Sequence, residues 1–242
     1  MQMTPTGKQL LLEAVAELGL NLEPRIPQFL TLFDLLTEAS QTTNLTAIRD
    51  EPGIILKHFV DSLTCLTYPD LLETRSVIDV GTGAGFPGLP LAIVQTDTQF
   101  DLLDATQKKI EFVHRAIQAL GLKNARALWG RSEELARQNV KRETYQAALS
   151  RAVASLATVA ELTLPLVRVG GFVLLQKGAN VEEEIAQARG ALRKLGGELD
   201  QILRIELPIS KDARSLIILR KIAATPPSYP RKPGVPAKNP LS

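Results

Sequence analysis

The chain of 242 residues is short of several features that define whole classes of protein. Its single cysteine, Cys65, excludes an intrachain disulfide, and no CxxC motif or Cys/His cluster indicates a zinc site. Apolar runs are broken by charge or glycine well before the roughly 20 residues that a membrane span needs. The first twenty residues carry acids inside their apolar stretch, which is untypical of a secretory signal. We expect a reduced, soluble, cytoplasmic protein without a metal.

Aromatic residues and net charge are also low. Aromatics make up 5% of the chain, too few for a platform that grips single strands. The formal net charge of +2 argues by itself against a strong nucleic-acid binder. The charge is uneven, however, because no acid follows Asp212. Six cations do follow it, which indicates an interaction tail: Arg214, Arg220, Lys221, Arg231, Lys232 and Lys238.

The first seventy residues have helical patterns. A capping box at Thr6 and Gln9 begins one helix, and Gly19 ends it. An apolar stripe at helical spacing predicts a second helix at about 24–40. Asp50 is placed as the N-cap of a third helix at about 51–67.

From residue 76, short apolar segments alternate with helical ones. We expect strands at 76–80, 99–103, 125–129, 146–150 and 171–176, separated by helices at 88–95, 107–120, 132–138, 155–168 and 181–195. This alternation predicts an α/β protein with a doubly wound parallel sheet. Two further strand-like runs, LDQILRIELP and SLIILRK, predict a closing hairpin. We therefore expect a helical extension packed on the core (1–70), an α/β domain (71–222) and a basic, proline-rich tail (223–242).

The sharpest local pattern is DVGTGAGFPG at 79–88, between a predicted strand and a predicted helix. Glycine permits positive φ there and lets a ligand approach the backbone. In an open α/β sheet, the crevice beyond the first strand is the expected ligand site. Many glycine-rich turns hold no ligand, but three alternating glycines after an acid favour one.

The loop fits two cofactors. Gly83, Gly85 and Gly88 satisfy the dinucleotide pattern GxGxxG, whereas Asp79, two residues before the first glycine, is typical of methyltransferases. Asp104 ends the next strand and is placed to accept hydrogen bonds from a ribose diol, which both cofactors carry. The closing hairpin favours a class I methyltransferase, and this point is an analogy of fold.

Eight segments, in this order and spacing, resemble the RsmG (glucose-inhibited division protein B) family of bacterial small-subunit rRNA guanine-N7 methyltransferases: NLTAI, KHFVDSL, IDVGTGAGFPGLPLAI, LLDATQKKIEFV, GRSEEL, LSRAVASL, LLQKG and YPRKPGVPAKNPL. The resemblance implies a class I, Rossmann-like, seven-stranded α/β fold with an N-terminal helical extension. It implies S-adenosyl-L-methionine as the methyl donor. The implied substrate is a guanine in the 530 loop of 16S rRNA, in the small ribosomal subunit.

The resemblance also implies cofactor-binding residues by matching position: Gly81, Phe86, Asp104, Ala105, Thr106, Ser132, Glu133 and Arg151. The second-strand segment reads Asp-Ala-Thr where many members have Asp-Ser-Leu. We therefore expect backbone or packing contacts from Ala105 and Thr106.

Candidate catalytic residues are His58, Asp61 and Arg151. The 7-nitrogen of guanine has a free lone pair, so no general base is obligatory and alignment can supply much of the rate. His58 and Asp61 share a helix face; the alternative role is a polar edge that docks this helix on the sheet. For Arg151 we expect the methionine carboxylate as partner first, and an RNA phosphate second.

Candidate RNA-binding residues are Lys177, Arg231 and Lys232. Lys177 ends the fifth strand, where the alternative is a solvated lysine. The tail that carries Arg231 and Lys232 is expected to be an extended basic arm along RNA, the alternative being a disordered solubility segment. Trp129, at the end of the third strand, is expected to pack.

Two other functions stay open on the residues alone. An NAD(P)-dependent oxidoreductase is permitted by GxGxxG and Asp104, although no Tyr-x-x-x-Lys set accompanies them. A nonenzymatic ribosome-assembly factor could retain the same fold. We expect a monomer.

Overall fold

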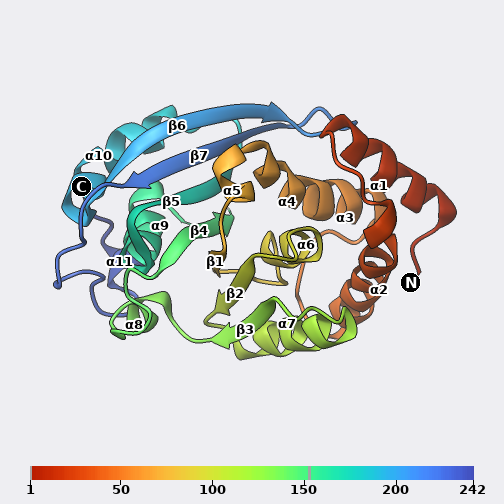
Figure 1. Ribbon diagram of the computed structural model, residues 1–242, viewed down its shortest axis with the longest axis horizontal. Coiled ribbons are helices and arrows are strands. Elements are labelled where there is room, and N and C mark those ends of the chain that lie inside the picture. Colours follow the sequence, from red (N-terminus) through yellow and green to blue (C-terminus); the bar gives the residue numbers. More distant parts are fainter. Residues whose placement is uncertain (1, 152–153) are drawn as a thin grey trace.

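A seven-stranded sheet organises the chain in the computed structural model, which describes residues 2–151 and 154–242 (Figure 1). The strand order is β3-β2-β1-β4-β5-β7-β6. The first five strands run parallel, and β7 is antiparallel to both β5 and β6. Their bounds are β1 Ser76–Val80, β2 Gln99–Asp104, β3 Ala125–Trp129, β4 Tyr145–Arg151, β5 Val167–Lys177, β6 Gly197–Glu206 and β7 Ala213–Lys221.

The strand order places a crevice beside β1. The chain moves outward from β1 to β2 and β3, then returns to the other side of β1 for β4. Loops that leave β1 and β4 therefore part in opposite directions at the carboxyl ends of these strands, where ligands of such sheets bind. All of the predicted strands, including the closing hairpin, are confirmed, with ends that differ by a few residues.

Helices cover both faces of the sheet, as Figure 1 shows. One face carries α1 Pro5–Glu17, α2 Ile26–Thr42, α3 Glu51–Ile54, α4 Asp61–Leu63, α5 Pro69–Leu72, α6 Gly88–Val94 and α7 Gln107–Ala119. The other carries α8 Ser132–Leu135, α9 Leu156–Thr163, α10 Glu182–Leu195 and α11 Val235–Lys238. Parallel strands between two helical layers are apolar on both sides, which explains runs such as SVIDV and AALS.

The N-terminal helices share a hydrophobic core with the sheet. Phe29 of α2 packs edge-on against Phe59, with ring centroids 5.4 Å apart. Both belong to the same cluster of buried residues as Phe100 of β2. The Gln28 amide donates to the Leu120 carbonyl, 3.1 Å away, and so joins α2 to the end of α7. The residues before 71 are thus packed on the sheet, and the boundaries at 71 and 223 stay predictions.

The helix expected at about 51–67 is continuous in the chain but changes its hydrogen bonding. It begins as α3, with the Asp50 carboxylate accepting from the Gly53 N–H at 2.9 Å. A wide π-helical turn spans Ile55–Val60, followed by α4 and a 3-10 turn at Thr64–Thr67. The spacing of apolar residues in the sequence does not predict the π turn, because a single wider turn changes the position of the apolar face of the helix very little. Such turns are frequent at functional sites.

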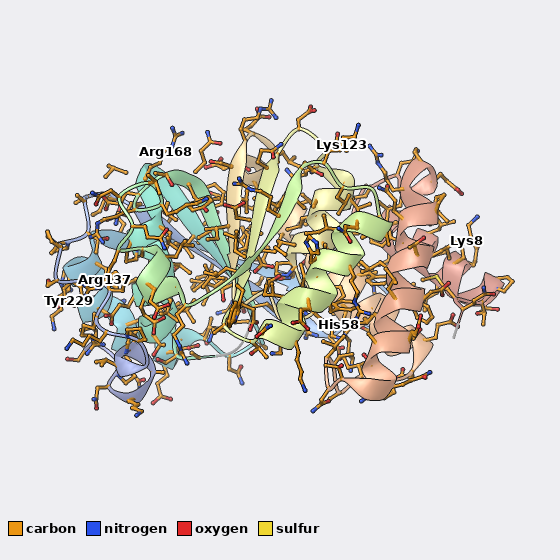
Figure 2. The ribbon with its side chains drawn as sticks, turned by 90° about the horizontal axis from the view of Figure 1, so that it is seen from below. Lys8, His58, Lys123, Arg137, Arg168 and Tyr229 are labelled. Carbon is orange, nitrogen blue, oxygen red and sulfur yellow. The ribbon has the colours of Figure 1, made fainter. Side chains whose placement is uncertain are left out.

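The prediction of an extended tail is wrong. Residues 223–242 fold back onto α8 and α9, and they carry the short helix α11. Thr225, Pro230 and Pro236 are buried. The Thr158 hydroxyl of α9 donates to the Pro236 carbonyl at 3.0 Å, and Arg137 donates to the Pro230 carbonyl at 2.7 Å. Figure 2 shows Arg137 and Tyr229 close together on this side of the molecule.

Two absences hold for the part of the chain that the structure describes. None of its helices is long and apolar enough to cross a bilayer. The same residues bring together no group of three or more His, Cys, Asp or Glu side chains suited to a metal ion.

Candidate active site

The glycine loop leaves the carboxyl end of β1 in a backbone form that needs glycine. Gly81 and Gly83 have φ of +74° and +60°, and a side-chain carbon at either would meet nothing within 4 Å. The requirement at these two positions is therefore conformational, and the space in front of them is open. Gly88 differs, because its Cβ would lie 2.1 Å from a Leu102 methyl carbon. Gly88 thus serves close packing of α6 on β2.

Asp79 holds the loop from within. It is fully buried, and its Oδ2 accepts from the Thr82 hydroxyl at 2.6 Å and from the Gly88 N–H at 2.9 Å. Its Oδ1 has no hydrogen-bond partner within the described chain. Burial raises the pKa of Asp79 to about 6, against the lowering effect of the two donors. This carboxylate shapes the loop from behind.

Asp104 ties the end of β2 to the same loop. Its Oδ2 accepts from the Gly83 N–H at 3.0 Å, and its Oδ1 accepts from the Thr106 N–H at 2.8 Å. A carboxylate has about four acceptor positions, so capacity remains for a diol. Ala105 and Thr106 follow it and are exposed. The structure therefore brings Gly81, Asp104, Ala105 and Thr106 to one edge.

The turn after β3 carries Ser132 and Glu133, both buried. The Ser132 hydroxyl donates to the Leu162 carbonyl of α9. The Glu133 Oε1 accepts from the Gly234 N–H of the tail at 2.9 Å. The tail thus contacts a residue that the resemblance places in the cofactor site. Nothing in the sequence pattern indicates this contact, because the two residues lie 101 positions apart.

Arg151, at the end of β4, reaches the helix that carries His58 and Asp61. Its Nη1 lies 3.4 Å from the Asp61 Oδ2 and donates to the Lys57 carbonyl at 3.1 Å. Its Nη2 lies 3.2 Å from the His58 Nδ1. Arg214 of β7 completes the group, with its Nε 3.2 Å from the Asp61 Oδ1. We call His58, Asp61, Arg151 and Arg214 the Arg–Asp cluster.

The hydrogen bonds of His58 define its tautomer. A guanidinium only donates, so Nδ1 accepts from Arg151 and the proton sits on Nε2. Nε2–H then donates to the Thr46 hydroxyl at 2.7 Å. Burial, helped by the Arg151 charge, lowers the pKa of His58 to about 3. The imidazole is therefore neutral near pH 7 and both of its nitrogens are engaged.

Phe86 connects the glycine loop to this cluster. Its ring stacks on the His58 imidazole, with centroids 4.8 Å apart and an interplanar angle of 15°. The Arg151 guanidinium carbon lies 5.3 Å from the same ring centre. The side chain is buried, so Phe86 joins the two halves of the site through its ring.

Sequence reasoning missed Arg214, although it listed this residue among the tail cations. Arg214 reaches Asp61 because the antiparallel hairpin returns β7 beside β5, opposite Lys177 and its neighbours. Predicting the residue-by-residue pairing of β7 with β5 would have placed Arg214 near the end of β5. Gln176 was missed as well: its amide donates to the Asp61 carbonyl at 2.6 Å.

The candidate RNA-binding residues are unequally available. The Lys177 ammonium lies 2.8 Å from Glu184 and donates to the Ala154 carbonyl. Arg231 is clamped on Glu161, with four hydrogen bonds from its guanidinium and backbone N–H. Lys232 is exposed. RNA contact by the three stays a prediction.

The prediction that Trp129 packs is wrong. Its side chain is 63% exposed. It borders a groove of about 780 Å³ between α7 and β3. Trp129 lies at the carboxyl end of β3. Lys123 and Arg168 lie at the amino ends of β3 and β5, near the top of Figure 2, and His58 is lower in that view.

Known proteins resemble the chain along nearly its whole length. The family profile of GidB, rRNA small subunit methyltransferase G, matches residues 25–212. The ribosomal RNA small subunit methyltransferase G of Deinococcus deserti is 46% identical over 239 residues, covering 99% of this chain and 98% of that protein. The protein of the same name from Oenococcus oeni is 48% identical over 214 residues and covers 88% of each chain.

Solved structures support the fold. An O-methyltransferase of Bacillus cereus in complex with SAH matches with a TM-score of 0.55 at 18% identity, over 79% of this chain and 90% of that one. A SAM-dependent methyltransferase of Aquifex aeolicus matches with a TM-score of 0.50 at 15% identity, over 69% and 93%. The predicted class I methyltransferase sheet is thus confirmed. By the profile and by these identities, the chain belongs to the GidB family, the rRNA small subunit methyltransferases G.

Proposed function

We propose that this protein transfers the methyl group of S-adenosylmethionine to the 7-nitrogen of a guanine in the 530 loop of 16S rRNA. Family membership over almost the whole chain carries this proposal. The site itself supports the cofactor. Open space in front of Gly81 and Gly83, and spare acceptor positions on Asp104, fit an extended ligand with a ribose diol.

The cofactor, when bound, supplies an electrophilic methyl group on a sulfonium sulfur. Asp104 would hold the ribose, Ala105–Thr106 and Ser132–Glu133 would flank the adenine, and Arg151 would face the methionine carboxylate. Gly81 and Phe86 would form the wall beneath the methionine. All of these positions follow strands whose carboxyl ends share one edge of the sheet.

The electrostatics of His58 agree with a reaction that needs no base. The target nitrogen carries a lone pair and no proton. His58 is neutral, and its only lone pair on nitrogen is directed at Arg151. The role proposed for His58 and Asp61 is therefore to fix Arg151 and the helix that borders the target nucleotide. Alignment and exclusion of water are the contributions expected from this chain.

A titration followed by a transfer assay tests the function. S-adenosylhomocysteine should bind and NADH should not, which separates a methyltransferase from an oxidoreductase. Small ribosomal subunits that lack the modification should then accept a labelled methyl group, and chemical cleavage should map it to 7-methylguanosine. Cofactor binding without incorporation would favour the assembly factor. Expectations of a monomer, of metal independence and of a cytoplasmic location stay predictions.

A further inference from the structure

The single tryptophan of the chain lies where an interior position was expected and is exposed. Trp129 ends the edge strand β3, and its Nε1–H donates to the Ala105 carbonyl at 3.1 Å. The protein thus satisfies the one polar atom of the indole and holds the ring at one orientation. A large ring fixed in this way presents its apolar face to something other than the core.

The ring borders a groove whose walls come from α7 and β3. The volume of about 780 Å³ lies in the range of ligand sites. Its apolar part comes from Ile110 and Ala127 beside Trp129, and its polar part from side chains of α7 that include Lys108 and Arg115. We call this surface the Trp129 groove.

The cations of the groove, Lys108 and Arg115, have no ion-pair partner within residues 2–151 and 154–242. Among the described residues, no carboxylate lies within ion-pair distance of Lys108 or Arg115, unlike Lys177 and Arg231. The one acid of the groove, Glu111, accepts from the Gln107 amide at 2.9 Å. Two unpaired cations beside an exposed aromatic ring match a phosphate backbone with an unstacked base.

The groove also continues the active site. Gln107 and Lys108 open α7 directly after Ala105–Thr106, the segment proposed to flank the cofactor. A strand whose guanine lies at the methyl group would therefore run over α7 within a few residues of the reacting position. Charge, an aromatic ring and continuity with the site together favour RNA over a protein partner.

We propose that the Trp129 groove binds a single-stranded segment of the rRNA next to the target guanosine, with one base stacked on Trp129 and phosphates on Lys108 and Arg115. This inference rests on the proposed function, because it takes rRNA as the substrate. It adds a binding surface outside the cofactor site and outside the tail.

The chain offers a direct probe, because Trp129 is its only tryptophan and tryptophan fluorescence reports this groove alone. A 16S rRNA fragment that contains the 530 loop should quench this fluorescence. Filter binding of the labelled fragment, which needs no tryptophan, measures the variants: Trp129→Ala should raise the Kd about 5- to 160-fold, the range of one lost stacking contact. Trp129→Phe, which keeps a ring, should stay within about threefold of wild type.

Matched variants separate the groove from general charge and from the cofactor. Lys108→Ala combined with Arg115→Ala should lower the salt dependence of RNA binding by roughly two charges. Arg168→Ala removes an exposed cation at the opposite edge and should leave it unchanged. With small subunits as substrate, Trp129→Ala should raise KM for subunits and leave the Kd for S-adenosylhomocysteine unchanged.

Two results would overturn the inference. An unchanged RNA Kd in Trp129→Ala would show that the ring stacks on no base. Weaker binding of S-adenosylhomocysteine, with an unchanged Kd for RNA, would assign the ring to the cofactor. Failure of the proposed function is recognised separately, in the absence of methyl transfer by the wild-type protein, while the fluorescence titration needs no catalysis.

Discussion

The tail and the Trp129 groove differ in what their cations contact. In the tail, Arg231 is bound to Glu161, a side chain with no exposed surface. In the groove, Lys108 and Arg115 border open space. Lys232, next to Arg231, is exposed, and Lys108 and Arg115 have no ion-pair partner among the described residues. The number of cations in a segment therefore predicts an interaction surface only when it is also known which acidic residues of the folded protein pair with them.

The largest effect is expected from Arg231→Ala. This change leaves Glu161 charged and buried without its partner, which costs about 3–5 kcal/mol of the free energy of unfolding. Urea unfolding measures it. Lys232→Ala, at the neighbouring exposed position, should change the same quantity by about 0.5 kcal/mol or less. A loss below about 1 kcal/mol for Arg231→Ala would mean that the ion pair does not anchor the tail.

The second-largest effect is expected at the carboxyl edge of the sheet, which lies next to both the tail and the Trp129 groove. Asp104→Ala removes the acceptor for the N–H groups of Gly83 and Thr106 together with the proposed ribose contact. The Kd for S-adenosylhomocysteine should rise tenfold or more, since each hydrogen bond to a charged group contributes about 1.5–3 kcal/mol. Asp97→Ala, away from this edge, is the control. Equal affinities in calorimetry would remove Asp104 from the cofactor site.

The pH dependence of His58 gives a smaller effect. Its pKa of about 3 in the folded state lies below the ordinary value of 6.5, so the unfolded chain binds the extra proton between these values. Stability from this group is complete above pH 6.5 and is lost as the pH falls toward 3. His58→Gln should flatten that part of the profile. Across pH 6.5–8.5 no inflection of kcat from His58 is expected, and one that vanished in His58→Gln would restore it as a base.

The smallest effect is expected from Lys177→Ala. Its ammonium is occupied by Glu184 at 2.8 Å, so the salt dependence of RNA binding should change by less than one charge. The double variant Lys108→Ala with Arg115→Ala is the comparison. A larger change for Lys177→Ala than for the groove pair would mean that ion pairing within the protein does not determine which cations contact the RNA.

Periodicity was enough to predict the sheet. A strand buried on both faces is a continuous apolar run, and β1 matches its expected range; the half-exposed edge strand β3 matches its range as well. The segments expected at the carboxyl edge follow from the same pattern, because parallel strands end on one side. Gly81 and Asp104 were therefore placed correctly at that edge, while their roles toward the cofactor stay predictions.

The parts that sequence could not predict depend on partners far along the chain. Arg231 is neutralised by a glutamate 70 positions away, and Arg214 reaches Asp61 across 153 positions. Trp129 is exposed because β3 is an edge strand and its indole N–H finds the Ala105 carbonyl. None of these contacts leaves a local trace in composition or spacing.

The anchoring of the tail has a consequence for the order in which the protein matures. Synthesis proceeds from the N-terminus, and folding can begin before it ends. Among the described residues, Glu161 forms its ion pair with Arg231, and Glu133 accepts a hydrogen bond from the Gly234 N–H. The sheet can therefore assemble on the nascent chain, whereas the contacts that residues 231 and 234 make with α8 and α9 form only after this later segment has been synthesised. The edge of the sheet that is proposed to bind the cofactor would thus be among the last parts of the protein to be completed during synthesis.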